Sequence, residues 1–531
     1  MNIFFFLVSI LFFLWTIRNI LFWVALWQLK EYRFDRVFIH LKETGQGRIL
    51  LFSPLSLLKW TVIFAYAVVV FNEALLFPYQ VVVAIIFTFQ AFLIFKEFFL
   101  HFLRKPVLTF KAIFIIFLTF FIIFLLFLFP LVEWLLWFLI LDRFTPLLVA
   151  FFVFSLSFPT EIYRDLQIEK AVKKIKNHKK LLVIAVTGSY GKSSTKDYIA
   201  QILGKRFRVL KTEGTNNTPI AIANTILLRL KKDTEIFIVE MGAYKRGEIA
   251  QMCQIVHPRI GVLTAVSHQH LSLFGNLENT FAAKYELIES LPKNGLALFN
   301  GNNKNLDRLY QKTKKKKALY QSKVSKGNKT DIFAFNINVK KTSVSFDTLL
   351  KNKVFHLNAP LIGEQNVENI LPGIFIADYL GMTDKEIKKA VSSLSPLPKT
   401  MIYNLGLNGA ALIDDTFNAN PDAVLAALEY LKIYKGKKIL VLQPMIELGK
   451  KADEEHYRVA QKISIACDYL FLTNGNFYKP ISEGVRDGRG NCLVKVGNPS
   501  ELAEFIGKNT KREDIVIFEG KEAANILNQM I

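Results

Sequence analysis

Residues 183–195 read Val-Ile-Ala-Val-Thr-Gly-Ser-Tyr-Gly-Lys-Ser-Ser-Thr, and this stretch decides the fold of the half of the chain that follows it. An apolar strand leads into a glycine turn, and a lysine with two hydroxyl residues then opens a helix. Such a turn binds a nucleotide phosphate through backbone N–H groups and the lysine charge, and its first hydroxyl can ligate Mg²⁺. The residues expected to bind the phosphates of ATP are Gly188, Ser189, Tyr190, Gly191, Lys192, Ser193 and Ser194.

Composition separates this nucleotide-binding half from a very different first part. The chain has 531 residues, is 52% hydrophobic and contains 48 phenylalanines, most of them before residue 160. The formal net charge of +23 suits a membrane-facing surface, and no recognisable nucleic-acid motif accompanies it. The three cysteines form neither a disulfide framework nor a zinc pattern, so we expect a reducing compartment.

The first 160 residues are expected to form a helical membrane domain of about five spans, since a span needs about 20 apolar residues. The expected spans are Ile3–Trp27, Leu55–Phe77, Tyr79–Phe95, Val107–Phe129 and Leu131–Phe158. Lysines and arginines of the intervening loops, for example Lys30 and Arg104, mark the cytoplasmic side. Phe77-Pro78-Tyr79 and Pro130 are expected to be external turns. This topology places the rest of the chain in the cytoplasm, where ATP is found.

Four ionisable residues lie within or beside these apolar runs. Glu73, Glu133 and the Asp142-Arg143 pair are costly at membrane depth and are therefore candidates for a functional role. For Glu133 an interface position is the preferred interpretation. For Asp142-Arg143 a local ion pair and a functional role are equally plausible, and a split of the last span into a re-entrant hairpin is a third option.

Beyond a basic linker at residues 161–180, short β-branched runs alternate with helical segments, which predicts α/β domains with parallel sheets. We expect a P-loop, parallel-sheet ATP-binding domain at residues 181–398 and a Rossmann-like α/β domain at residues 399–531. Residues 312–329 are polar and lysine-rich and are expected to form a loop. The expected strands are Leu181–Thr187, Arg208–Lys211, Glu235–Met241, Ile260–Thr264, Leu296–Asn300, Ala411–Asp414, Lys438–Leu442, Tyr469–Thr473 and Asp514–Phe518.

Six further segments follow the phosphate loop in a fixed order. They read T-N-N-T-P (215–219), I-F-I-V-E-M-G (236–242), S-H-Q-H-L (267–271), F-A-A-K-Y-E (281–286), L-I-G-E-Q-N-V-E-N (361–369) and I-D-D-T-F-N-A-N-P (413–421). Taken alone, Glu240 is an ordinary charged strand end, Lys284 is a solvated helix lysine, and two histidines do not complete a zinc site. A carboxylate at a strand end near a phosphate loop can, however, hold Mg²⁺.

Together these segments resemble the Mur ligases, and in particular the class that adds D-alanyl-D-alanine to a UDP-linked muramoyl tripeptide. The resemblance covers about residues 181–531, and I-D-D-T-F-N-A-N-P is its most specific segment. It implies an ATP-dependent, ADP-forming ligase of peptidoglycan precursor synthesis. Such an enzyme joins a carboxylate to an amine through an acyl phosphate.

The resemblance also implies roles for individual residues, with ATP and Mg²⁺ as cofactors. Lys192, Lys284 and His270 are implied to act in catalysis. The implied metal ligands are Ser193, Glu240, His270 and Lys284, the last as a carbamate. The residues implied to contact ATP beyond the phosphate loop are Asn300, Asn366, Asn369 and Asp415. Those implied to bind the reacting substrates are Asn216, Asn217, Thr218, Asn418 and Asn420.

Several positions depart from the family pattern. Gln365 replaces a histidine, Lys399-Thr400-Met401 stands where the family has an arginine, and Phe518-Glu519-Gly520-Lys521 replaces a V-K-G-S stretch. The largest departure is at the front, where membrane spans stand in place of the family's UDP-binding domain. The muramoyl-peptide acceptor is therefore expected to be either UDP-linked or lipid-linked, with an amino acid or dipeptide as the amine.

These features predict a protein integral to the cytoplasmic membrane with cytoplasmic catalytic domains. Membrane lipid is an expected partner, other cell-envelope enzymes are a further option, and nucleic acid is not expected. A transporter or flippase with a regulatory nucleotide-binding domain is the alternative from another functional class. A Mur ligase relative with a changed amine specificity also stays open.

Overall fold

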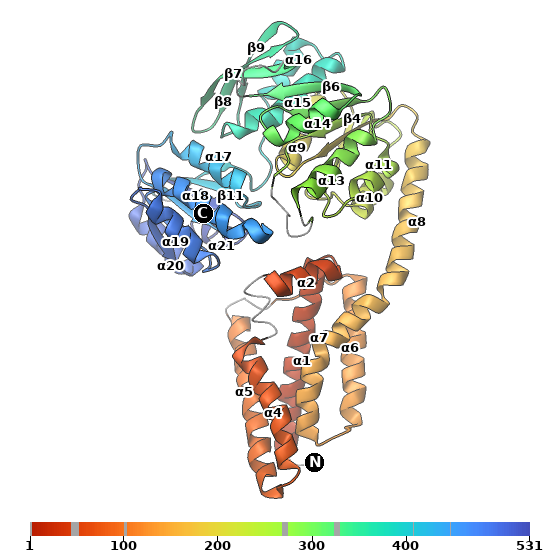
Figure 1. Cartoon of the computed structure of the whole chain (residues 1–531), viewed down its shortest axis with the longest axis vertical. Coiled ribbons are helices and arrows are strands. Elements are labelled where there is room, and N and C mark those ends of the chain that lie inside the picture. The colour runs from red at the N-terminus through yellow and green to blue at the C-terminus, as the bar shows by residue number, and fades with distance from the viewer. Residues whose placement is uncertain are drawn as a thin grey trace. The chain divides into compact units, whose positions relative to one another are not determined.

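The structure is a computed structural model and describes residues 3–43, 52–99, 104–267, 274, 276–322, 330–406, 408–446 and 448–531. It divides into two compact units, Met1–Asp165 and Leu166–Ile531. Both are drawn in Figure 1, and each is described by itself below.

The first unit is a bundle of helices, and the long helices α1, α4, α5, α6 and α7 run side by side in Figure 1. Phenylalanines from different helices fill its centre. The rings of Phe12 and Phe138 stack with their centroids 4.6 Å apart, and Phe87 meets Phe12 edge-on at 5.8 Å. The helices are α1 (Ile3–Leu29), α2 (Phe34–Glu43), α4 (Pro54–Val69), α5 (Leu76–Phe99), α6 (Phe110–Leu128) and α7 (Trp134–Ser155), with the 3₁₀ helix η1 (Glu73–Leu75).

Among the described residues, four helical stretches are long and apolar enough to cross a membrane, namely Ile3–Leu29, Glu73–Phe99, Phe110–Leu128 and Trp134–Lys176. The second of the five expected spans is shorter than expected, because α4 has 16 residues. At 1.5 Å per residue it covers about 24 Å, against the ~30 Å of a hydrocarbon core. The expected turn at Phe77-Pro78-Tyr79 is also wrong. The break lies at Val70–Asn72, where Asn72 caps η1, and Pro78 fits into the first turn of α5.

The ionisable residues of the bundle are paired across helices. The carboxylate of Asp142 on α7 pairs with Lys59 of α4 and accepts a hydrogen bond from the Trp15 indole of α1 at 2.7 Å. Arg18 of α1 donates to Glu97 of α5 at 3.0 Å. The re-entrant option for Asp142-Arg143 is excluded, because α7 is continuous through both residues. Glu133 caps α7 by accepting from the Leu135 and Leu136 N–H groups, both at 2.9 Å.

The second unit begins within α8 (Ser157–Lys176) and contains two sheets. The first has nine strands in the order β2-β3-β1-β4-β5-β6-β7-β8-β9, parallel from β2 to β7 and antiparallel from β7 to β9. Its strands are β1 (Leu182–Thr187), β2 (Val209–Lys211), β3 (Ile236–Glu240), β4 (Ile260–Leu263), β5 (Leu296–Asn300), β6 (Lys316–Gln321), β7 (Ile332–Val339), β8 (Val344–Leu350) and β9 (Lys353–Ala359).

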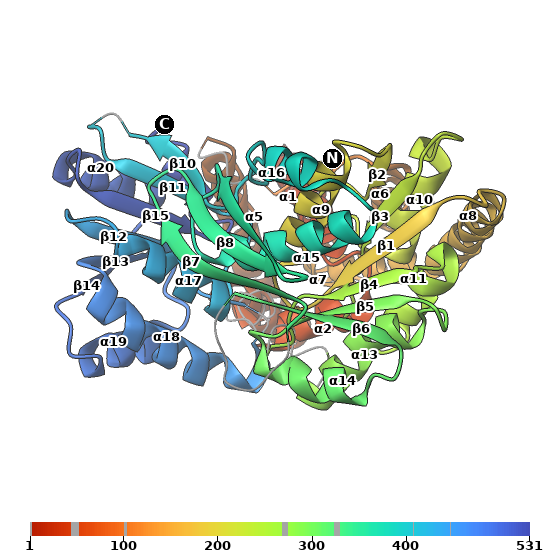
Figure 2. The same cartoon turned by 90° about the horizontal axis from the view of Figure 1, so that it is seen from above.

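Helices cover both faces of this sheet, as Figure 2 shows from above. Successive strand residues point to opposite faces, so Ile184 and Val186 of β1 join one core, and Val183 and Ala185 join the other. The first core is closed by α9 (Lys192–Leu203), α15 (Gln365–Tyr379) and α16 (Asp384–Val391). The second is closed by α8, α10 (Pro219–Arg229), α11 (Glu248–Val256), α13 (Leu277–Glu289) and α14 (Asp307–Lys312).

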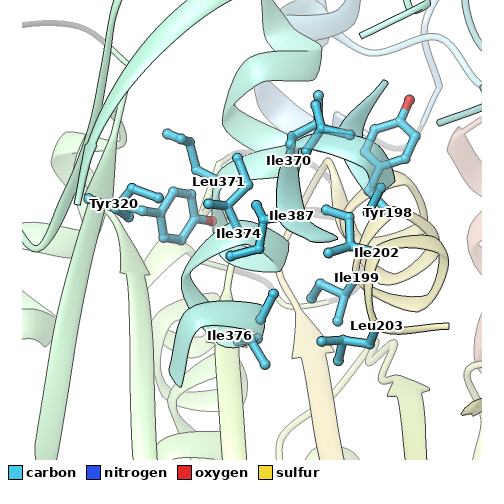
Figure 3. Packing of buried hydrophobic residues seen from close by; sticks show 14 of the residues in the cluster. Tyr198, Ile199, Ile202, Leu203, Tyr320, Ile370, Leu371, Ile374, Ile376 and Ile387 are labelled. Atoms are coloured by element: carbon cyan, nitrogen blue, oxygen red, sulfur yellow. The ribbon is translucent and has the colours of Figure 1, made fainter. Parts of the chain in front are cut away.

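The interface between α9 and α15 fixes the position of the phosphate loop, because α9 follows that loop directly. Figure 3 shows Ile199, Ile202 and Leu203 of α9 facing Ile370 and Ile374 of α15, and all five are buried. Gly373 lets the two helices approach closely: a Cβ there would lie 2.7 Å from the Ile202 Cδ1 atom and 3.4 Å from the Ile199 Cα atom. The tight packing therefore ties the two helices together.

The second sheet has six strands in the order β10-β11-β15-β12-β13-β14 and is parallel except for β10. Its strands are β10 (Ile402–Leu405), β11 (Ala411–Asp415), β12 (Lys438–Leu442), β13 (Tyr469–Leu472), β14 (Leu493–Val496) and β15 (Ile515–Glu519). The helices around it are α17 (Pro421–Leu431), α18 (Ala452–Ala466), α19 (Tyr478–Asp487), α20 (Pro499–Asn509) and α21 (Ala524–Leu527).

All nine expected strands are confirmed, each to within one residue at either end. The expectation of a loop at residues 312–329 is wrong in part, because β6 occupies Lys316–Gln321 and pairs with β5. Two lysines open this strand, but Ala318, Leu319 and Tyr320 are buried. Pairing with the neighbouring strand and burial of these residues favour a strand despite its two lysines. The local sequence does not show these contacts.

Candidate functional site

The phosphate loop connects β1 to α9, and two of its glycines are required by close contacts. A Cβ on Gly188 would lie 2.1 Å from the Thr264 hydroxyl and 2.8 Å from the Ala265 backbone nitrogen. Gly191 has φ of +75° and caps α9, and a Cβ there would lie 2.8 Å from Asn369 Oδ1. The strand-turn-helix thus leaves an open backbone cradle at a helix N-terminus, the arrangement that binds phosphate groups.

Neighbouring strand ends hold this loop in place. The Ser189 N–H donates to the Ala265 carbonyl at 2.7 Å, and the Thr264 hydroxyl donates to the Tyr190 carbonyl at 2.5 Å. The Lys192 ammonium donates to the Ser189 carbonyl at 2.9 Å. Burial lowers the pKa of Lys192, and the charge of Glu240 opposes that shift. The half-buried Lys192 side chain therefore folds back onto the loop that is expected to bind phosphate.

A buried charge cluster lies beside the loop. Glu240 ends β3, next to β1, and its carboxylate accepts from Lys196 at 3.3 Å and from the Asn217 amide at 3.1 Å. Lys284 of α13 is only 2% exposed, and its pKa falls to about 7, first because of burial and second because of the Lys192 charge. A substantial fraction of the Lys284 amine is thus uncharged near neutral pH.

A pocket of about 210 Å³ opens at the phosphate loop and is lined by both domains of the second unit. From the first domain it is lined by Ser189, Tyr190, Gly191, Lys192, Ser193, Ser194, Gln365, Asn366, Glu368 and Asn369. From the second it is lined by Thr400, Met401, Asp415, Phe417, Asn418, Asn420, Asp422, Ala423 and Ala426. The loop predicted to bind phosphate and the segment I-D-D-T-F-N-A-N-P therefore meet in one pocket.

The asparagines of the first domain are largely engaged within the protein. Asn366 lines the pocket, but its amide accepts from the Tyr198 hydroxyl at 2.9 Å and donates to the Ile362 carbonyl at 2.8 Å. Asn300 lies behind the pocket wall and donates to Glu368 at 3.1 Å. Asn302 donates to the same carboxylate at 2.6 Å. Glu368 is thus the polar group that this network presents to the pocket.

The expected substrate-binding residues fall in two places. Asn418 and Asn420 line the pocket, and Asn420 also caps α17 by accepting from the Ala423 N–H at 3.0 Å. Asn216, Asn217 and Thr218 do not line it. They lie in the loop before α10, beside Glu240, where the Gly242 N–H donates to the Asn217 carbonyl at 3.0 Å.

Asp415 lies at the pocket wall and accepts from the Met401 N–H at 3.2 Å. Its pKa is raised to about 7, chiefly because the carboxyl group is buried. His270, expected as a metal ligand and a catalytic residue, lies outside the described residues.

Sequence reasoning missed two groups that shape the site. Lys196 pairs with Glu240 and donates to the Gly214 carbonyl at 3.0 Å, so it links α9 to the loop that carries Asn217. Glu368 is the other. It stands inside the quoted segment L-I-G-E-Q-N-V-E-N, directly before Asn369, and this place in the segment was the available signal. Lys196 gave no signal beyond its place four residues after Lys192.

The donor set suits Mg²⁺ shared with nucleotide phosphates. Ser193 and Glu240 offer hard oxygen ligands, and Mg²⁺ commonly uses one or two carboxylates together with substrate phosphates. Within the described ranges no three His, Cys, Asp or Glu side chains gather as a metal site of their own.

Comparison with known proteins agrees with this geometry. Residues 186–377 match the Mur ligase middle domain, and residues 401–522 match the Mur ligase, glutamate ligase domain. A UDP-N-acetylmuramoyl-tripeptide--D-alanyl-D-alanine ligase of Haemophilus influenzae is 30% identical over 337 residues, which cover 62% of this chain and 72% of that relative. The chain belongs to the Mur ligase family. The enzyme of the same name from Bacillus subtilis is 27% identical over 348 residues, 65% of this chain and 74% of the relative.

Solved Mur ligases show the same fold. MurF from Acinetobacter baumannii superposes with a TM-score of 0.62 at 23% identity, covering 69% of this chain and 79% of that one. MurF from Thermotoga maritima, solved in complex with ADP, gives a TM-score of 0.61 at 24% identity, covering 69% and 83%. The two Mur ligase domain matches begin at residue 186, so the helical bundle of the first unit lies outside them.

Proposed function

We propose that this chain is an ATP-dependent ligase that joins D-alanyl-D-alanine, or a similar amine, to the carboxylate of a muramoyl-peptide precursor. The observation that carries the proposal is the pocket shared by the phosphate loop and the I-D-D-T-F-N-A-N-P segment. A nucleotide whose phosphates lie on the loop would meet Asp415, Asn418 and Asn420 across the same pocket. Family membership and the names of the relatives point to the same reaction class.

Different residues of the first domain would bind the phosphates and the metal ion. Backbone N–H groups of the glycine cradle and the Lys192 charge would hold the β- and γ-phosphates. Ser193 and Glu240 would hold Mg²⁺, and the family resemblance adds His270 and carbamylated Lys284. When bound, Mg²⁺ would neutralise charge on the transferred phosphate. Support for the carbamate is the Lys284 pKa of about 7, because only the neutral amine can react with CO₂.

The loop beside Glu240 is a suitable place for the reacting carboxylate and amine. Asn217 donates to Glu240 and lies on the same loop as Asn216 and Thr218. A carboxylate bound there would lie near the metal side of the phosphate loop. Attack of the carboxylate on the γ-phosphate would give an acyl phosphate and release ADP, and attack of the amine on the acyl carbon would then form the amide and release phosphate. Lys192 would stabilise the charge that develops on the transferred group.

We further propose that the first unit anchors the enzyme in the cytoplasmic membrane, with the second unit in the cytoplasm. Four apolar helical stretches of sufficient length support this. Because the bundle stands where relatives carry a UDP-binding domain, a lipid-linked acceptor is a second candidate beside the UDP-linked one. The ion pair of Asp142 and Lys59, buried in the otherwise apolar interior of the bundle, favours a defined structure over a plain anchor.

The test uses the full chain purified in detergent, with ATP, Mg²⁺ and D-alanyl-D-alanine. UDP-linked and lipid-linked muramoyl tripeptide are compared by phosphate release and by product mass. Product from either acceptor supports the proposed ligase activity. The acceptor that gives more product decides between the UDP-linked and the lipid-linked substrate. Lys192→Met should abolish product, whereas Lys205→Met, an exposed lysine at the far end of α9, should not. ATP hydrolysis that needs neither acceptor nor amine would instead favour the transporter alternative.

A further inference from the structure

Two acidic side chains end neighbouring parallel strands at the wall of the nucleotide pocket. Asp415 ends β11 and Glu519 ends β15, and the two residues are paired in register. Register partners in a sheet project to the same face. Asp415 lines the pocket, and Glu519 lies behind it with 0% of its surface exposed. The two carboxyl groups are therefore held side by side, with Glu519 away from solvent and Asp415 half-buried at the pocket wall.

No hydrogen-bond donor of the described residues reaches Glu519, since both of its carboxyl oxygens are buried without a donor. Asp415 accepts from the Met401 N–H at 3.2 Å. Neither carboxyl group takes part in an ion pair with a lysine, arginine or histidine of the described chain. A buried carboxylate without donor or counter-charge is very costly, so this arrangement requires another source of stabilisation.

The charged groups around Asp415 and Glu519 do not supply this stabilisation. Asp414, the neighbouring residue on β11, is itself acidic and is engaged by the Thr416 N–H at 3.1 Å. Tyr198 of α9 is the further titratable group that senses the Asp415 charge, and its hydroxyl donates to Asn366. On the other side of β15, the register partner of Glu519 is Leu442 of β12. A proton on one of the two carboxyl groups would provide the missing donor.

We propose that Glu519 is a positioning residue of the nucleotide pocket, which keeps its proton at neutral pH and donates it to the Asp415 carboxylate. The proton would change two facing acceptors into a donor and an acceptor, and hydrogen bonds to an ionised acceptor are the strong ones. Above pH 7 Asp415 would thereby be ionised and fixed at the pocket wall between the Met401 N–H and the Glu519 acid. This assignment rests on the proposed nucleotide site for its functional meaning.

The titration expected for such a pair agrees with the geometry. Burial raises the pKa of Glu519 well above its usual range, and it raises the pKa of Asp415 to about 7. The values belong to the pair as a whole. Above pH 7 the pair would carry one proton, and below it a second proton would neutralise Asp415. Loss of a charged acceptor for a nucleotide hydroxyl would weaken binding about fivefold, the difference between charged and neutral acceptors.

The first experiment looks for the proton itself. Infrared spectra of the full chain in detergent, without nucleotide, are recorded at pH 8 for wild type, Glu519→Gln and Glu522→Gln. Glu522 is a matched control, because its carboxylate accepts from Thr473 and Asn474, both at 2.7 Å, and needs no proton. The carbonyl band of a protonated carboxylic acid should vanish in Glu519→Gln and persist in Glu522→Gln. A band that persists in Glu519→Gln would overturn the proposal.

Asp415→Asn covers the case in which Glu519→Gln fails to fold. It should keep the band but shift its frequency, since the acid would then face an amide. An unshifted band would mean that the acid does not face residue 415, which refutes the pairing. Absence of the band from wild type, as a cation held between two ionised carboxylates would cause, also refutes it.

The second experiment measures ADP affinity at pH 6 and pH 8. Wild type and Glu522→Gln should bind about fivefold more weakly at pH 6, beyond any effect of the ADP phosphate itself, which all variants share. Glu519→Gln should keep this extra dependence, because a glutamine amide, like the protonated acid, donates to Asp415 at both pH values, whereas Asp415→Asn should lose it. A dependence that persists in Asp415→Asn, or that Glu519→Gln abolishes, would overturn the positioning role. If ADP does not bind at any pH, the proposed nucleotide site fails, and the infrared result still decides whether the proton is shared.

Discussion

Truncation of Ile199 to alanine tests whether the contact between α9 and α15 holds the phosphate loop in place. Ile199 is completely buried and faces α15 (Figure 3), and its Cα atom would lie 3.4 Å from a Cβ on Gly373 of that helix. Because both helices are pinned to the same sheet, the gap left by the lost methyl groups cannot close by a simple shift. Substitutions of this kind cost about 2–5 kcal/mol, as lost transfer free energy plus the free energy of the cavity.

For a domain of this size, ~3 kcal/mol lowers the melting temperature by roughly 6–12 °C. The assay is thermal melting of the full chain in detergent, combined with hydrogen exchange measured by mass spectrometry on peptides from α9 and α15. Hydrogen exchange is needed because several domains melt in one thermal experiment. It shows which domain has lost stability. Ile199→Val should cost about 0.5–1.5 kcal/mol.

Leu228→Ala is the matched control, because Leu228 lies on α10 with 83% of its surface exposed. It should change stability by no more than about 0.5 kcal/mol. If Ile199→Ala destabilised the protein no more than Leu228→Ala, the α9–α15 contact would not be the core that the structure shows, and the account of how the loop is positioned would fail.

Three further predictions concern the loop, the bundle and the acidic pair. Gly188→Ala should abolish ATP binding measured by calorimetry while the first unit stays folded, because the added Cβ meets a hydroxyl and a backbone nitrogen at 2.1 and 2.8 Å. Lys59→Met should destabilise the bundle by about 3–5 kcal/mol by removing the nearest cation from the buried Asp142 carboxylate, which keeps only the more distant Arg143, and adding Asp142→Asn should restore most of the melting temperature in detergent. Because burial raises the pKa of Asp415 to about 7, the folded state binds more protons than the unfolded state between about pH 4 and 7. Stability of the second sheet should therefore fall as pH rises through that window, and hydrogen exchange should show a weaker fall in Asp415→Asn; an equal fall would refute the assignment.

The local sequence pattern was enough to predict an element where one physical signal dominates. The strand of residues 182–187 is short, apolar and closed by a glycine turn, and it forms where it was expected. By contrast, β6 begins with lysines, and β7, β8 and β9 form an antiparallel extension that has no signal comparable to a strand before a phosphate loop. Their stability comes from partners far along the chain.

The candidate site also contains residues that the sequence predicts and residues that it does not. Lys192 and Asp415 stand in motifs whose chemistry is readable, and both line one pocket. Asn300 and Asn366 stand in similar motifs, but their amides are used within the protein, which only the three-dimensional contacts reveal. Lys196 could not be predicted, because it lies on α9 and its partner Glu240 ends β3, and only the pairing of β1 with β3 brings the two together.

The position of β15 has a consequence for how the protein is made. This strand comes after every other strand in the chain, yet it lies in the interior of its sheet, between β11 and β12. Domains generally fold one after another as the chain leaves the ribosome. The sheet that carries Asp415 cannot close until residue 519 has emerged, so during synthesis β11 and β12 each expose an unpaired edge. Such edges can pair with other chains. A ribosome that stalled between β12 and β15 would therefore release an aggregation-prone product, even though the bundle and the nine-stranded sheet were already complete.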